Sequence, residues 1–109
     1  MTAAYLVIYE GEPDDPAEFV RYYESVHVPL LRGFPAIRGV EVHVRHDGPG
    51  PFLVTRLLFD TVEELRFAVE GPYRPVTRRD MEENILPRFS GTVRHVVTDV
   101  VDGSGPTEG

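Results

Sequence analysis

The chain has 109 residues, of which 41% are hydrophobic, and its formal net charge is −7. This length and composition predict one globular domain, and the acidic balance argues against binding to nucleic acid or to anionic membrane surfaces. The sequence has no cysteine, which excludes disulfides, thiolate nucleophiles and cysteine-based metal sites. The apolar run at residues 5–9 is too short to span a membrane and follows no basic segment, so we expect a cytoplasmic protein.

The first part of the sequence predicts a strand and then a helix. Residues 3–10 are β-branched and aromatic without helical spacing, which indicates a strand. Asp15 can cap the following helix, with Pro16 in its first position and Glu18 completing a capping box. From residue 16 toward residue 31, apolar side chains recur at three- and four-residue intervals and predict one buried stripe, formed by Phe19, Tyr23, Val26 and Leu30.

His27 and Pro29 disturb this helix. His27 lies four residues after Tyr23 and therefore borders the apolar stripe. Val28 precedes a proline, which disfavours α geometry at that residue. We therefore expect the helix to be distorted or to end near His27.

The rest of the chain predicts three more strands and two helical segments. Residues 37–47 alternate between apolar and polar, residues 48–51 form a turn, and residues 52–60 form a strand that is apolar on both faces. Thr61 and Glu64 repeat the capping box and open a helix that stops before Gly71 and Pro72. A short helix is expected within residues 73–86, a last strand at residues 91–101 and a flexible tail at residues 102–109.

The order strand, helix, strand, strand, helix, strand predicts an α+β, ferredoxin-like domain over residues 1–101, with a four-stranded antiparallel sheet and both main helices on one face. Such a sheet should be polar on its bare face, yet the third and fourth strands are apolar on both faces. A second copy of the chain is the simplest cover, so we expect a homodimer whose sheets face each other.

Two stretches of the sequence resemble a known family. "FVRYYESVHVPLL" (residues 19–31) is similar to the first-helix motif of the EthD-like group of dimeric α+β barrel proteins, and "LLFDTVEEL" (residues 57–65) is similar to its junction between third strand and second helix. Asp80 in the late helix fits the same pattern. The resemblance implies a barrel of two face-to-face sheets with a cavity in each subunit. Relatives include cofactor-independent isomerases, lactone isomerases, polyketide cyclases and dehydratases.

His27 and Tyr23 are the first candidates for a catalytic site. A histidine near neutrality on a mostly buried face suits proton transfer beside a carbonyl or lactone. Alternatively, its ring bonds a carboxylate or backbone group and locks the helix end, where Pro29 leaves carbonyls without partners. The Tyr23 phenol could hold a substrate oxygen, or it could be a packed ring with a satisfied hydroxyl.

Three further residues carry charge near these positions. Arg56 lies in mid-strand and needs a partner, which could be a substrate anion, Glu41, or Asp99 across a dimer. His43 is a second acid/base candidate if its strand face points into a barrel, and is otherwise part of a polar face. Asp80 could orient His27, or it could belong to a charged helix surface.

The remaining features argue against metals and nucleotide cofactors. His46 is expected to be solvated and His95 to line the core or a pocket. The four histidines show no metal-binding spacing, and no glycine-rich phosphate loop is present. Haem occurs in the wider superfold, but nothing identifies an axial ligand, so we expect no cofactor and no metal.

The sequence favours a cofactor-independent enzyme that performs isomerisation, cyclisation or elimination on a hydrophobic, oxygenated small molecule. In this hypothesis His27 is the general acid/base, Tyr23 a hydrogen-bond donor, and Arg56 or His43 an electrostatic partner. The alternative is a non-catalytic ligand-binding or accessory protein of a degradation pathway. A cavity whose ionisable groups all have internal partners would favour this alternative, whereas a cavity with an open His27 that has no such partner would favour the enzyme.

Overall fold

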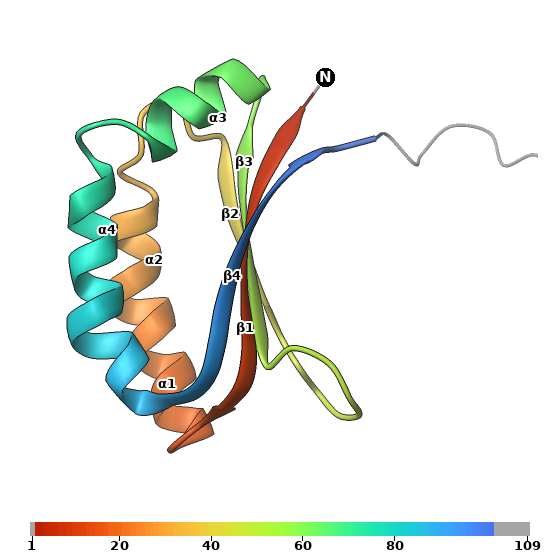
Figure 1. Cartoon of the computed structure of the whole chain (residues 1–109), viewed down its shortest axis with the longest axis vertical. Coiled ribbons are helices and arrows are strands. Elements are labelled where there is room, and N and C mark those ends of the chain that lie inside the picture. Colours follow the sequence, from red (N-terminus) through yellow and green to blue (C-terminus); the bar gives the residue numbers. More distant parts are fainter. Residues whose placement is uncertain (1, 102–109) are drawn as a thin grey trace, which may run out of the picture.

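The computed structural model describes residues 2–101 and shows a single antiparallel sheet with all helical segments on one face (Figure 1). The strand order is β2-β3-β1-β4, which is the ferredoxin-like arrangement predicted from the sequence. The strands are β1 (Ala3–Pro13), β2 (Gly39–Val44), β3 (Leu53–Phe59) and β4 (Phe89–Asp99). The expected tail lies outside the described residues. None of the helices within residues 2–101 has the length and apolar character needed to cross a membrane.

Two stretches of helix cover the sheet. The first comprises α1 (Pro16–Tyr22), the π-helical turn η1 (Tyr23–His27) and α2 (Val28–Leu31). The second follows α3 (Val62–Val69) and comprises α4 (Arg74–Asp80), the π-helical turn η2 (Met81–Ile85) and the 3₁₀ turn η3 (Leu86–Arg88). Figure 1 shows α4 running beside α1 and α2 on the same side of the sheet.

The predicted helix starts are present. Asp15 caps α1 by accepting a hydrogen bond from the backbone N–H of Glu18, with Pro16 in the first turn. Thr61 caps α3 in the same way, by accepting from the backbone N–H of Glu64. Both caps satisfy donors that a helix leaves unpaired at its N-terminus, and they fix where the two helices leave the sheet.

The π-helical turn η1 explains how the chain accommodates Pro29. Proline lacks the N–H that would bond four residues back, and the turn before it widens so that the N–H of Val28 reaches the carbonyl of Tyr23. The expectation that Val28 would leave α geometry was wrong, since its φ and ψ are −58° and −45°. The chain absorbs the proline by changing helical register instead.

This change of register moves the buried stripe. A π turn inserts one residue into the helical repeat, so positions after it rotate by about 100° relative to an ideal α-helix. Phe19 and Tyr23 are buried as predicted, but Val26 is 38% exposed. The buried positions that follow are His27, Val28 and Leu31. The π turn therefore carries His27 from the border of the stripe into the core.

The core lies between the sheet and the helices. Its densest part is a group of rings with centroids 5.6–6.5 Å apart, contributed by Tyr9, Phe19, Tyr23, Phe52 and Phe89. If the predicted strand began at residue 52, Phe52 would share a face with Val54, but the strand begins one residue later. Phe52 precedes β3 and is only 5% exposed, so its ring turns into the core.

The opposite face of the sheet carries no helix (Figure 1). The strand register places one set of apolar side chains on this face, each half-buried within the protomer: Leu6, Ile8, Val54, Leu58 and Val96. We call this helix-free surface of the sheet the open sheet face.

Candidate active site

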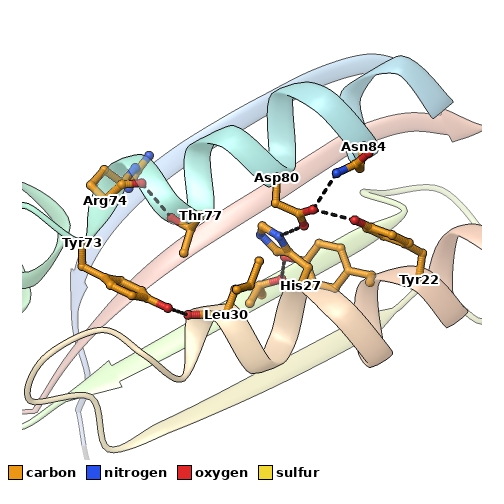
Figure 2. Close-up of polar contacts among 10 residues, drawn as sticks. Tyr22, His27, Leu30, Tyr73, Arg74, Thr77, Asp80 and Asn84 are labelled. Carbon is orange, nitrogen blue, oxygen red and sulfur yellow. Dashed lines mark hydrogen bonds and ion pairs between the residues drawn. The ribbon is translucent and has the colours of Figure 1, made fainter.

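A hydrogen-bonded cluster of polar side chains joins the two helical stretches that lie side by side on the sheet (Figure 2). The Nδ1 atom of His27 lies 2.7 Å from Oδ2 of Asp80, and the two side chains are 4% and 8% exposed. The other carboxylate oxygen of Asp80 accepts hydrogen bonds from the Tyr22 hydroxyl at 2.5 Å and from Nδ2 of Asn84 at 2.9 Å. Three neutral or weakly basic donors thus surround one buried carboxylate.

Both members of the central pair lie at π-helical turns. His27 is the last residue of η1, and Asp80 immediately precedes η2. The wider π turn rotates His27 inward, and α4 runs alongside so that Asp80 meets the ring (Figure 2). Asn84 lies four residues after Asp80 and therefore reaches the same carboxylate along one helix face. π turns are frequent at functional sites, and here two of them frame the same pair.

The electrostatics of the pair favour a neutral histidine. Burial lowers the pKa of His27 below its usual 6.5, and the opposing influence of Asp80 does not overcome this. Burial alone would raise the pKa of Asp80, but hydrogen bonds from Tyr22, Asn84 and His27 outweigh it and lower that pKa. A carboxylate accepts at both oxygens, so Nδ1 of the neutral ring carries the proton and Nε2 carries the lone pair.

His27 also lines a small cavity between the sheet and the helices. The cavity has a volume of about 20 Å³, enough for a water molecule or a group of similar size. Its lining is largely apolar and aromatic, with Val7, Leu31, Phe34, Leu57 and Met81 beside Tyr5 and Tyr9. The polar residues in the lining are His27, Arg74, Thr77, Arg78 and His95. We call this the His27 cavity.

Tyr23 is buried beside His27, but its hydroxyl is engaged elsewhere. The two ring centroids are 4.9 Å apart, and the Tyr23 hydroxyl lies 2.6 Å from Oγ1 of Thr55 on β3. Burial raises the pKa of Tyr23 to about 12, so the phenol stays protonated. The residue packs behind His27 and does not line the His27 cavity.

Tyr9, and not Tyr23, is the tyrosine beside His27 that lines the cavity. Its side chain lines the His27 cavity, and its buried hydroxyl has no hydrogen-bond partner of good geometry within residues 2–101. Burial and then the neighbouring Tyr23 raise the pKa of Tyr9 well above its usual value. Tyr9 is therefore a protonated tyrosine with a free donor, and its side chain lines the same cavity as His27.

Arg56 and His43 lie on the open sheet face, away from His27. Arg56 donates to Oε1 of Glu41 at 2.8 Å, across neighbouring positions of β3 and β2. Nε2 of His43 lies 3.2 Å from the same oxygen. The hydrogen bond with His43 and the charge of Arg56 lower the pKa of Glu41. Within the protomer, the electrostatic partner of His27 is Asp80.

A second, larger cavity lies between β2 and the first helical stretch. Its volume is about 300 Å³, and its walls are mainly valines and a leucine: Val20, Val28, Val40, Val42, Val44 and Leu53. Tyr23 lines it, together with Glu24 and Arg32. The cavity therefore offers apolar space with one acidic and one basic residue, but no histidine.

Sequence reasoning did not identify Tyr22, Asn84 or Tyr9 as site residues. Asn84 carried a signal, because it stands four residues after Asp80 in a predicted helix. Tyr22 carried none, since its direction depends on how its helix packs against α4. Among residues 2–101, no group of three or more histidine, aspartate or glutamate side chains is arranged to hold a metal ion.

Comparison with solved structures shows which proteins share this fold. An ethyl tert-butyl ether D (EthD) family protein from Bacillus halodurans superposes with a TM-score of 0.76 at 20% identity, covering 93% of this chain and 100% of that one. A dimeric ferredoxin-like protein from Bacteroides fragilis gives 0.62 at 14% identity, with coverage of 91% and 96%. SnoaB, a cofactor-independent oxygenase from Streptomyces nogalater, gives 0.62 at 12% identity, with coverage of 96% and 98%.

Sequence comparison identifies the family of this chain but no individual protein of known activity that it matches. No protein with a curated description matches this chain significantly. The family model of the EthD domain matches residues 12–102, which include His27, Asp80 and every strand except the first nine residues of β1. The chain therefore belongs to the EthD domain family.

Proposed function

We propose that this protein is a cofactor-independent enzyme that transfers a proton on a small, oxygenated organic substrate, with His27 as the general base. The observation that carries the proposal is the His27–Asp80 pair, in which Nδ1 is bonded to a buried carboxylate and the ring lines a cavity. Asp80 orients the ring and stabilises the imidazolium that forms when the base takes a proton. The family and the cofactor-independent oxygenase of the same fold support chemistry without a bound cofactor.

The chemical step follows from these roles. Nε2 of His27 removes a proton from a carbon beside a carbonyl, and the electron pair of the broken C–H bond remains on the substrate as an enolate. The Tyr9 hydroxyl, which is protonated and belongs to a side chain that lines the same cavity, donates a hydrogen bond to the enolate oxygen. The His27 imidazolium then returns the proton at another position, which isomerises the substrate, or protonates a leaving group, which completes an elimination.

We further propose that the protein works as a homodimer through the open sheet face. Half-buried leucine, isoleucine and valine side chains on a face without helices are characteristic of a surface that a second subunit covers. The Bacteroides fragilis protein of the same fold is dimeric. Covering this face would enclose the Arg56–Glu41 pair, whose side chains are 31% and 46% exposed in the protomer.

Hydrogen–deuterium exchange of acidic substrate protons tests the proposed chemistry without knowledge of the natural substrate. Ethyl acetoacetate, a butenolide and acetoacetate are incubated in D₂O with the wild type or with His27→Gln, and the loss of C–H signals is followed by proton NMR. We expect the wild type to accelerate exchange on at least one probe and the variant to lose at least about 100-fold of that acceleration. Equal exchange rates with the two proteins would reject His27 as the base.

A non-catalytic ligand-binding role is the second candidate, and the larger cavity favours it. That cavity of about 300 Å³ can hold an apolar ligand, and it has no histidine to act near neutral pH. Binding of an apolar ligand that is unaffected by His27→Gln and abolished by Val42→Glu, together with no catalysed exchange on any probe, would favour this role.

A further inference from the structure

Two arginines stand one turn apart on α4 at the His27 cavity. Arg74 and Arg78 both line this cavity, as does His27 from the opposing helix. Residues four apart on a helix present their side chains on one face, so the two guanidinium groups converge on the same opening. This places two positive charges beside the proposed base in a chain whose net charge is −7.

Neither arginine is neutralised by a carboxylate within residues 2–101. Five other arginines form ion pairs with carboxylates at 4 Å or less, namely Arg21, Arg38, Arg45, Arg56 and Arg94. Arg74 instead contacts Tyr5, donating to its hydroxyl at 3.2 Å while the guanidinium lies 5.5 Å from the ring centroid. The Nε atom of Arg74 is buried and has no acceptor in the described part of the chain. Arg74 is thus held in place with donor capacity left over.

The positive charges of Arg74 and Arg78 affect the neighbouring His95. It lines the same cavity, and its ring centroid lies 5.6 Å from that of Tyr5. His95 is exposed over much of its surface, yet the partial burial of its ring and then the positive charges of Arg74 and Arg78 lower its pKa. His95 therefore stays neutral at pH 7, which leaves the two arginines as the positive groups at this opening.

We propose that Arg74 and Arg78 bind the carboxylate of a small organic acid at the edge of the His27 cavity, with the enolisable carbon of the acid in the cavity. This inference rests on the proposed function and names its substrate class, a small organic anion with an enolisable carbon. A guanidinium binds a carboxylate through paired N–H donors, and the two oxygens would fill the free donor capacity of Arg74. The apolar wall formed by Val7, Leu31 and Leu57 suits a methyl or methylene group of the acid, which is about as large a group as the cavity of about 20 Å³ holds. The same two charges stabilise the enolate that forms when His27 takes a proton.

Binding of acetate and of its neutral counterpart acetamide tests this assignment directly. Titrations at constant ionic strength are followed by NMR signals of the His95 ring in the wild type, Arg74→Met, Arg78→Met and Arg79→Met. Arg79 is the matched control, because it is an exposed arginine on the same helix that does not line the cavity. We expect the dissociation constant for acetate to rise about 10- to 100-fold in each cavity variant, as loss of a charge-assisted hydrogen bond implies, and to stay unchanged in Arg79→Met.

Three results would overturn the proposal: equal acetate binding by the wild type and both cavity variants, acetamide binding as tight as that of acetate, or no saturable acetate binding. If Arg74→Met fails to fold, Arg74→Lys keeps the charge without the paired donors and should still weaken acetate binding. Acetate is not one of the exchange probes, so the two proposals fail separately. Acetate binding without catalysed exchange on any probe rejects only the proton-transfer function, whereas exchange on the neutral ester without acetate binding rejects only the anion site.

Discussion

Nδ1 of His27 lies 2.7 Å from Oδ2 of Asp80, a residue 53 positions later in the sequence, and this contact joins two helical stretches. The pair is buried, and Tyr22 and Asn84 complete the hydrogen bonding of the carboxylate. A buried carboxylate that accepts three hydrogen bonds is stabilised in its ionised form. It therefore holds the imidazole in the tautomer that leaves Nε2 free to accept a proton.

Acidification should destabilise the protein in two steps. Burial lowers the pKa of His27, so below pH 6.5 the unfolded chain takes up a proton that the folded chain resists, and the free energy of unfolding falls. The pKa of Asp80 is also lowered, so its contribution is present above its unfolded value of 3.8 and is lost as the pH falls through the folded value. Thermal unfolding of the wild type and of His27→Gln between pH 8 and pH 3, about the range that these values span, measures both steps. The first step should be smaller in the variant, because His95, whose pKa is also lowered, still contributes to it. An unchanged profile would contradict this assignment.

Asp80→Asn should impair proton transfer more than it impairs folding. An asparagine can donate to Nδ1, which moves the ring proton to Nε2 and removes the lone pair from the cavity side. We expect catalysed exchange to fall at least about 100-fold. The free energy of unfolding should fall by about 1–3 kcal/mol, because buried donors lose a charged acceptor. Asp60→Asn, at an exposed carboxylate paired with Arg38, is the control and should change neither quantity appreciably. Full exchange activity in Asp80→Asn would show that the carboxylate does not set the tautomer.

Tyr22→Phe should act through Asp80. The change removes one hydrogen bond to the carboxylate, which should raise the pKa of Asp80 and cost about 0.5–1.5 kcal/mol of stability. Tyr23→Phe is a matched comparison, because it removes a buried hydroxyl of the same helix that bonds Thr55 instead. Carbon NMR of the Asp80 carboxyl should show a shifted titration in Tyr22→Phe and a much smaller change in Tyr23→Phe. Equal titrations in both variants would contradict the proposed role of the Tyr22 hydroxyl.

Charge on the open sheet face should dissociate the proposed dimer. Leu58 lies on this face and is half-buried in the protomer, so Leu58→Glu would place a carboxylate in the subunit interface. Sedimentation velocity should show a dimer for the wild type and a monomer for the variant at micromolar concentration. Phe67→Glu on α3 is the control, because Phe67 is 70% exposed on the helical side. A wild-type monomer at these concentrations would contradict the dimer.

The sequence predicted the fold because its signals were local. Runs of β-branched and aromatic residues, with clean alternation only in residues 37–47, identified the strands. The capping residues Asp15 and Thr61 marked the helix starts to the residue. The chain order of these elements then left few topologies, of which the ferredoxin-like one is observed. These features depend on backbone geometry within a few residues, which a sequence pattern records.

The site was predicted less completely because it depends on one change of helical register. An ideal helix would bury Val26 and Leu30, whereas the π turn before Pro29 buries His27 and Leu31. Sequence periodicity assumes a constant 3.6-residue repeat and cannot place residues beyond such a turn. The contact of His27 with Asp80 was one of two alternatives that the sequence left open, and the structure shows it. The contact of Tyr22 with Asp80 depends on how two helices pack, and the spacing of residues in the sequence does not encode that packing.

The protonation state of the His27 ring at pH 7 is the most direct test of the central claim. Nitrogen-15 NMR of histidine-labelled protein, with His27→Gln used to assign the ring signals, distinguishes the two neutral tautomers from the imidazolium. The structure predicts a neutral ring with its proton on Nδ1, an unprotonated Nε2, and a pKa below 6.5. An imidazolium at pH 7, or a neutral ring protonated on Nε2, would contradict the assignment of His27 as a general base held by Asp80.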